Sequence, residues 1–301
     1  MRTQPTFGSD RFPAHGYVGL FIISFAEASL FAGNDLIGRW FTPIVWTGYV
    51  LFADAWVFHL KRRSPLVSDR LAFLVIIITS ILTWWMFEFY NAPRFWRSDL
   101  ELWWHYHNLE PNPFLRRVGY DWAFATIFPG LFLTAEIFSA TVFRQSPRTR
   151  PMQISRAAMI GCLIIGAALA SLPLAIVSAW FAPLVWLAFI LLVDPLNALR
   201  GWPSICGDLA RGDWRRLCSL LASGLVCGVL WEFWNYWAIS RWTYTVPYFG
   251  DIKIFEMPVL GYLGFPPFAV ECWAIYIFCR SLLAPPSRMD ETDIWMRTRD
   301  D

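Results

Sequence analysis

The sequence has 301 residues, of which 56% are hydrophobic, 18% aromatic and only 16% charged, with a net charge of +2. Soluble domains carry about 25% charged residues, so this chain has too few charges to cover a surface that faces water. The composition therefore excludes an ordinary soluble domain and favours a membrane protein, and no motif or charge excess indicates nucleic-acid binding.

Eight apolar segments are long enough to cross a membrane as helices. A hydrocarbon core of about 30 Å requires about 20 helical residues, and the run LAFLVIIITSILTWWMFEF has this length. The stretch 157–198 is divided into two spans because Pro173 and Pro183 flank a predicted hairpin. In chain order, the expected spans are roughly 17–35, 40–60, 71–90, 119–143, 157–175, 180–198, 217–238 and 260–283.

Basic residues in the short loops predict the orientation. The loops 61–70, 144–156 and 199–216 and the tail beyond Arg280 are all basic. With eight spans, these segments and the N-terminus share one side. We therefore expect a multi-pass protein of the cell (plasma or inner) membrane with both termini in the cytoplasm. The first span lacks a small-residue cleavage site and is expected to remain as a helix.

Two pairs of matching segments indicate an internal repeat. WFTPIVWTGYVLFAD (40–54) matches WFAPLVWLAFILLVD (180–194), and FEFYN (87–91) matches WEFWN (231–235). The matches fall in the second and third predicted helices of each half.

Acidic residues near the last span of each half have the same spacing. Asp121 precedes Glu136 by fifteen residues, and Glu256 precedes Glu271 by fifteen. We therefore expect an all-α membrane protein of two tandem four-helix repeats. Because four spans return the chain to its starting side, the repeats should run parallel. The predicted repeats are residues 1–150 and 151–301, which together form one membrane domain.

Acidic side chains occur within the predicted spans, whereas Lys and Arg occur only at the span ends. The acids are Glu27, Asp54, Glu88, Asp121, Glu136, Asp194, Glu232 and Glu271, with Glu256 just before the last span. An ionised carboxylate in a bilayer costs several kcal/mol, so such residues are functional by default. Without a basic partner, burial favours the neutral carboxylic acid, which can donate a proton.

Glu88 and Glu232 are the leading catalytic candidates because an asparagine follows each of them three residues later. This spacing places Asn91 and Asn235 on the same helix face as the acid, where the amide can bind the acid or a water beside it. The further catalytic candidates are Glu136, Glu256 and Glu271. Structural hydrogen bonds to neighbouring helices are the expected role of Asp54, Asp194 and Glu27.

Tryptophans gather at the outer ends of the third and seventh predicted spans. Most membrane tryptophans anchor a helix at headgroup depth. Alternatively, the rings line an apolar pocket and stabilise a cation on their faces. The candidate substrate-binding residues are Asn91, Asn235, Trp84, Trp85, Trp231 and Trp234.

We expect neither a metal site nor a cofactor. His105 and His107 form an HxH motif, but no second cluster completes a set of ligands. The six cysteines lie mostly within predicted helices without CxxC spacing, which is typical of small core residues.

The segment GDIKIFEMPVLGYLGFPPFAVECWAIYIF (250–278) resembles the membrane-embedded lycopene cyclase domain. The glutamate-bearing helix before it is similar to that of the related carotenoid hydratases. The resemblance covers residues 217–283 and, more faintly, 71–143. The resemblance departs at the proline. The family has paired acids after that proline, whereas this chain has one acid before it, Glu256. Four helices in each unit is also one more than the family has.

The resemblance implies repeated small helical units and an enzyme that needs no redox cofactor. It also implies that Glu88 and Glu232 are the acid or base pair, with Glu256 and Glu271 as second candidates.

Three classes of function are compatible with the sequence. The first is a cofactor-free acid/base enzyme that cyclises, isomerises or hydrates an isoprenoid or carotenoid-like lipid. In that reaction a buried acid protonates an alkene or epoxide, and ring faces hold the cation away from water. The second is a proton-coupled transporter or channel, because repeats and intramembrane acids also describe these proteins. The third is a non-enzymatic lipid-binding or scaffolding protein whose acids join helices.

Overall fold

The computed structural model of the protein describes residues 11–92, 102–145, 149–245, 247, 250–283, 287 and 289–298. Within these residues, eight helical segments are long and apolar enough to cross a membrane, which confirms the predicted spans. They are α1 (Ala14–Phe31), α3 (Phe41–Lys61), α5 (Arg70–Asn91), α6 with α7 (Pro113–Ala125 and Ile127–Ala140), α8 (Arg156–Ala175), η1 with α9 (Ala179–Phe181 and Ala182–Leu199), α11 (Arg215–Trp237), and η2 with α12 (Val259–Gly264 and Phe265–Leu283).

Short helices and strands lie between and beyond the spans. The helices are α2 (Asp35–Arg39), α4 (Pro65–Ser68) and α10 (Ile205–Ala210). The strands are β1 (Trp104–His107), β2 (Arg241–Tyr244), β3 (Lys253–Ile254), β4 (Met257–Pro258), β5 (Met289–Asp290) and β6 (Arg297–Thr298). They pair antiparallel as β1 with β2, β3 with β4 and β5 with β6.

The fourth span begins earlier than predicted and is interrupted. Asn112 caps α6 by accepting from two backbone N–H groups, and Pro113 follows at the first helical position, where proline is favoured. Pro129 has no N–H to give to the carbonyl four residues earlier and crowds it, which accounts for the break after α6. Ser80 of α5 binds both sides of the break, donating to Phe124 O (2.5 Å) and accepting from Phe128 N (3.0 Å).

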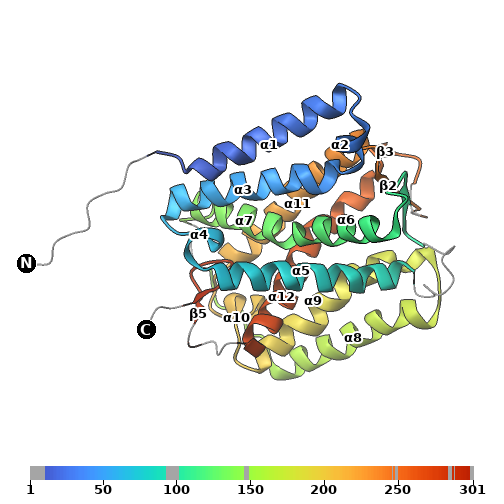
Figure 1. Cartoon of the computed structure of the whole chain (residues 1–301). Coiled ribbons are helices and arrows are strands. Elements are labelled where there is room, and N and C mark those ends of the chain that lie inside the picture. The colour runs from blue at the N-terminus through green and yellow to red at the C-terminus, as the bar shows by residue number, and fades with distance from the viewer. Residues whose placement is uncertain are drawn as a thin grey trace, which may run out of the picture.

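The helices α7 and α12 form the centre of the bundle. Helix α7 packs against α3, α5 and α11, and α12 packs against α9, α11 and α5. Helix α1 covers α3 on one flank and α8 covers α9 on the other (Figure 1). Helices α1 and α3 approach closely at two glycines, because a Cβ atom at Gly48 would lie 2.8 Å from the carbonyl oxygen of Gly19. Small residues allow such contacts between membrane helices.

Apolar side chains cover the outside of the bundle, and polar ones are buried within it. Phe21, Leu82 and Ile164 are each more than 60% exposed, whereas Ser80 and Ser223 are fully buried. A contiguous apolar surface of this kind marks contact with a membrane. Length, composition and surface therefore describe a multi-pass membrane protein.

The two ends of the bundle are closed by different segments. Strands β2 and β3 lie at one end, and α4, α10 and β5 lie at the other (Figure 1). The second end is covered by residues 289–298, which we call the C-terminal hairpin. Ile294, Trp295 and Met296 are at most 2% exposed. Trp273 and Tyr276 of α12 hold the hairpin by donating to the carbonyl oxygens of Ile294 and Trp295, both at 2.8 Å.

Two of the acids in the spans anchor the short helices at the C-terminal-hairpin end. Asp54 accepts from Ser64 Oγ (2.8 Å) and from Leu66 N (3.1 Å) at the start of α4. Asp194 accepts from Ile205 N (2.7 Å) and Cys206 N (2.9 Å) at the start of α10. Both carboxylates thus have the structural role expected from the sequence.

Asp121 and Glu136 differ from the expectation that the acids in the spans lack basic partners. Asp121 pairs with Arg117, one turn earlier in α6, at 2.9 Å. The second exception is Glu136. It forms an ion pair with Lys61, the last residue of α3, which also contacts Asp293 of the C-terminal hairpin. Glu136 further accepts a hydrogen bond from Ile294 N at 2.6 Å. The long side chain of Lys61 extends from the end of α3 to the buried acid. A lysine at the boundary of a span can therefore pair with an acid inside the bundle.

Replacing Lys61 with methionine should destabilise the protein strongly, because Glu136 and Asp293 would then be buried without Lys61 as countercharge. Breaking a buried ion pair costs about 3–5 kcal/mol. The matched control is Arg39→Met, which removes an exposed pair with Asp35 and should cost about 0.3–0.5 kcal/mol. Thermal unfolding of the purified variants in detergent measures both. Equal losses in the two variants would contradict the role given to Lys61.

Candidate functional site

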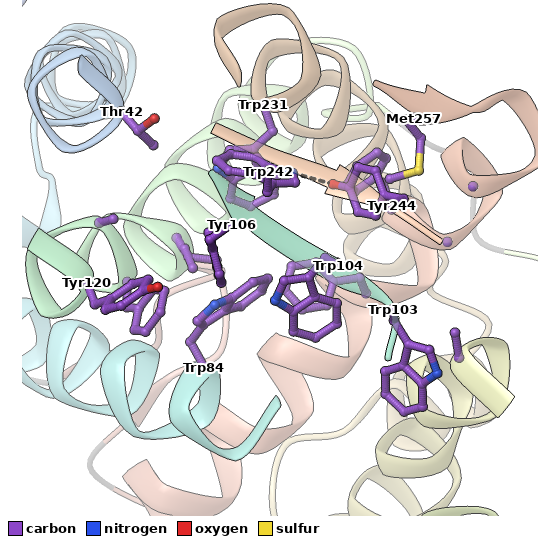
Figure 2. Close-up of a pocket in the computed structure, with 18 of the residues that line it drawn as sticks. Thr42, Trp84, Trp103, Trp104, Tyr106, Tyr120, Trp231, Trp242, Tyr244 and Met257 are labelled. Carbon is purple, nitrogen blue, oxygen red and sulfur yellow. Dashed lines mark hydrogen bonds between the residues drawn. The ribbon is translucent and has the colours of Figure 1, made fainter. Parts of the chain in front are cut away.

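A cavity of about 550 Å³ lies between the β1–β2 ribbon and the adjoining ends of the helices (Figure 2). Most of its wall is apolar and is dominated by aromatic rings, and the charged residues on it are Arg39, Glu110 and Arg116. The wall includes Trp46 of α3, Trp84 of α5, Trp186 of α9, Trp231 of α11 and Phe268 of α12. Residues far apart in the chain thus meet around one space of the size that small-molecule ligands occupy.

The ribbon presents one aromatic face to the cavity. Trp104 pairs with Tyr244 and Tyr106 pairs with Trp242 in the antiparallel register. Because alternate residues of a strand point to opposite faces, these four side chains lie on the same face, and all four line the cavity (Figure 2).

The HxH motif lies on the opposite face of the ribbon. His105 Nε2 is 2.7 Å from Thr245 Oγ1, and His107 Nε2 is 2.8 Å from Thr243 Oγ1. The two histidines therefore make cross-strand hydrogen bonds. Among the described residues, no group of three or more His, Cys, Asp and Glu side chains is placed to hold a metal ion.

Asn91 and Asn235 fasten the two strands of the ribbon to the ends of α5 and α11. Asn91 Oδ1 accepts from Trp103 N (2.8 Å) and Trp104 N (3.2 Å), and its Nδ2 donates to Trp104 O (2.9 Å). Asn235 makes the same contacts with Trp242, accepting from N and donating to O, both at 2.8 Å. Each side-chain amide thus binds the main chain of a strand as a neighbouring strand would. Neither asparagine lines the cavity.

Glu88 and Glu232 lie directly behind the aromatic face of the ribbon. Glu88 Oε1 accepts from Tyr106 Oη (2.6 Å), Trp84 Nε1 (2.9 Å) and Trp104 Nε1 (3.2 Å). Glu232 Oε1 accepts from Tyr244 Oη at 2.7 Å, and Tyr244 Oη in turn accepts from Trp242 Nε1 at 2.6 Å. Neither acid is part of the cavity wall, so the two tyrosines stand between the acids and the cavity.

The two acids differ in the hydrogen bonds that they accept. Within the described residues, the buried Oε2 of Glu232 has no hydrogen-bond partner. Oε1 of Glu88 accepts three hydrogen bonds, all from aromatic side chains. Within the same residues, Glu232 therefore retains an oxygen that can carry or accept a proton.

Tyr106 and Tyr244 are held in their protonated form. Burial raises the pKa of both phenols well above their usual range, and the adjacent carboxyl groups of Glu88 and Glu232 raise it further. Both hydroxyls therefore act as hydrogen-bond donors toward the acids near neutral pH.

The other three catalytic candidates lie elsewhere. Glu256 pairs with Arg241 of β2 at 3.1 Å beside the ribbon. Glu136 lies at the opposite end of the bundle, where Lys61 pairs with it. Glu271 is fully buried in α12 and accepts from Phe189 N at 3.2 Å, and its Oε2 has no partner among the described residues. The structure therefore places Glu88 and Glu232 behind the tyrosines of the cavity wall, with Glu256 beside the ribbon and Glu136 and Glu271 away from it.

The four candidate tryptophans divide into two pairs. Trp84 and Trp231 line the cavity. Trp85 Nε1 instead donates to Asp121 (2.7 Å), and Arg117 lies over its ring at 4.0 Å. Trp234 Nε1 donates to Glu27 at 3.0 Å, which gives Glu27 a structural contact.

Sequence reasoning missed the tyrosines and tryptophans of the ribbon. The signal that could have found them is the tripeptide W-x-Y, present as WHY at 104–106 and as WTY at 242–244. Each copy follows an E-x-x-N motif, and its Trp and Tyr are the residues that face the cavity. Thr42 and Trp46 were not predicted as site residues either. Both line the cavity, and within the described residues Thr42 Oγ1 and Trp46 Nε1 have no hydrogen-bond partner.

Comparison with protein-family models, with curated proteins and with solved structures finds no match to this chain.

Removing the amide of Asn235 should loosen the ribbon. In Asn235→Ala, the N–H and C=O groups of Trp242 lose their partner, which costs about 1–3 kcal/mol for a buried group. Amide hydrogen exchange of residues 241–244 should accelerate by roughly 5- to 150-fold. The control Asn112→Ala removes the α6 cap and should leave this segment protected. Unchanged exchange in Asn235→Ala would show that the amide does not hold the strand.

Proposed function

We propose that this protein binds an isoprenoid or carotenoid-like lipid in the aromatic cavity and acts on it by cofactor-free acid/base chemistry, as a cyclase, isomerase or hydratase. The observation that carries the proposal is the pair of buried glutamates, each bonded to a tyrosine that lines a mostly apolar cavity. The resemblance of residues 250–278 to the lycopene cyclase domain is consistent with it.

The position and lining of the cavity suit an apolar ligand. It lies where membrane spans end, and in the proposal a lipid enters it from the bilayer. Ring faces of Trp84, Trp104 and Trp231 carry negative charge density that stabilises a carbocation, and exclusion of water prevents its premature capture. Thr42 and Trp46 add two polar atoms without a partner in the described part of the chain, which suit a ligand that carries or acquires an oxygen.

The acid–tyrosine pairs provide a route for protons. In the proposed step, Glu232 is protonated and donates to Tyr244 Oη as Tyr244 passes its hydroxyl proton to an alkene carbon of the lipid, so that no phenolate forms. A cation results on the neighbouring carbon, and Glu232 is left as the carboxylate. In cyclisation or isomerisation, the cation then loses a proton through Tyr106 to Glu88, and the cycle closes when Glu88 releases this proton to solvent and Glu232 takes one up. In hydration the cation gains water, and the proton released returns through Tyr244 to Glu232. Such positioned acid/base groups contribute about 10²–10⁴-fold to a rate.

Binding without chemistry is the second candidate function, because neither glutamate is part of the cavity wall and Glu88 already accepts three hydrogen bonds. Under this alternative, the acids serve only to hold the aromatic wall in place. Transport is less well supported, because the C-terminal hairpin closes the end of the bundle opposite the cavity.

We also propose that the chain is two tandem four-helix repeats, residues 1–150 and 151–301, in parallel orientation. Three matched sets of contacts support this: α1 on α3 and α8 on α9, Asp54 and Asp194 at the short helices, and the E-x-x-N motifs with their W-x-Y partners. The proposal includes the orientation expected from the basic loops, with the C-terminal hairpin on the cytoplasmic side of the cell membrane and the cavity on the other.

Expression in an isoprenoid-overproducing bacterial host tests the enzymatic proposal. Untargeted mass spectrometry of lipid extracts should detect a cyclised, isomerised or hydrated prenyl product with the wild type. Glu232→Gln and Tyr244→Phe should each lower that product by about 100-fold or more, because they interrupt the proton route. The Glu88→Gln/Glu232→Gln double variant should abolish it.

The control is Glu291→Gln, which alters an exposed acid at the opposite end of the bundle. This variant should keep wild-type product levels. Identical extracts from cells with and without the folded wild-type protein would reject the enzyme. In that case, lipid retained by the purified protein would support the binding function.

A further inference from the structure

A second cavity, of about 300 Å³, lies at the C-terminal-hairpin end of the bundle. It is formed where α3 and α7 end and α11 begins. Four basic side chains line it, from Lys61, Arg63, Arg144 and Arg215. None of them belongs to the aromatic cavity, so this is a separate site with a different character.

Two of the four cations are neutralised by acids. Lys61 contacts Glu136 and Asp293, and Arg63 Nε donates to Asp293 Oδ2 at 3.1 Å. These four side chains carry two positive and two negative charges when all are ionised. This half of the cavity wall therefore has no net charge and does not attract a further anion.

The other two cations have no ion pair among the described residues. Arg144 follows the end of α7 and is exposed, and Arg215 is the first residue of α11. The nearby acid Asp213 accepts from the backbone N–H of Arg215 at 3.0 Å and not from its guanidinium group. The positive end of the α11 dipole adds to the same local potential. Two uncompensated guanidinium groups thus meet at one cavity.

We propose that this basic cavity binds the phosphate group of an anionic membrane lipid. Its position at the ends of three spans is the depth at which lipid headgroups lie. Guanidinium groups form paired hydrogen bonds to phosphate oxygens. Leu60 and Ala140, also on the wall, offer apolar contact beside the cations. Basic pockets between membrane helices bind lipid headgroups by this combination.

The test uses the purified full-length protein in detergent with three separate probes: phosphatidylglycerol, phosphatidylcholine and inorganic phosphate. Binding is followed by native mass spectrometry and by the shift of the thermal unfolding midpoint. We expect phosphatidylglycerol to bind and to raise the midpoint, and phosphatidylcholine to bind more weakly. Arg144→Gln/Arg215→Gln should weaken phosphatidylglycerol binding by about 30-fold, since each arginine near a headgroup contributes about one factor of five.

The control is Arg150→Gln/Arg156→Gln, which removes the same charge from two arginines of the basic loop 144–156 that do not line the cavity. It should bind phosphatidylglycerol as the wild type does. Arg144→Lys/Arg215→Lys keeps the charge and should retain most of the affinity, which separates binding from a folding defect.

Two results would overturn the proposal. One is equal phosphatidylglycerol binding by the wild type and the Arg144→Gln/Arg215→Gln variant. The other is equal weakening in the control pair, which would mean that only total charge matters. Saturable, arginine-dependent binding of inorganic phosphate without lipid binding would assign the cavity to a soluble phosphate and overturn the lipid assignment.

Discussion

The constraint on which the structure depends is that polar groups within a membrane must find their partners inside the protein. Here five of the acids in the spans satisfy it by accepting hydrogen bonds from the segments that connect or follow the spans. Asp54 and Asp194 hold the starts of α4 and α10, and Glu136 holds the C-terminal hairpin. The same principle operates at the other end, where Glu88 and Glu232 bind the aromatic ribbon. The acids therefore fasten irregular segments to the helix ends.

The aromatic cavity follows from this arrangement. Asn91 and Asn235 bind the main chain of Trp104 and Trp242, and so tie strands β1 and β2 to the ends of α5 and α11. Paired as a ribbon, they cover the helix ends with four aromatic residues. The glutamates orient those rings by accepting hydrogen bonds from tyrosine hydroxyl and tryptophan indole N–H groups. Structural anchoring and the proposed proton route thus use the same pairs of side chains, and Oε2 of Glu232 has no partner among the residues that the structure describes.

The sequence predicted the eight spans because each is a continuous apolar run that lipid requires, and it placed each Glu and Asn on one helix face from their spacing. It did not predict the ion pair of Glu136, because Lys61 lies 75 residues from Glu136 and 232 from Asp293. Nor did it predict that Tyr106 and Tyr244 would stand between the acids and the cavity. That result depends on the register of two strands from distant loops, and helix periodicity carries no information about it.

The central claim, that an isoprenoid occupies the aromatic cavity, is tested most directly by titrating the purified protein with retinol and following energy transfer from its tryptophans. Gly264 lines the cavity and Gly161 of α8 does not, and an added Cβ has open space at both. The account predicts saturable binding by the wild type and Gly161→Leu, weakened by about tenfold in Gly264→Leu because the leucine narrows the cavity. Equal binding by all three proteins would contradict it.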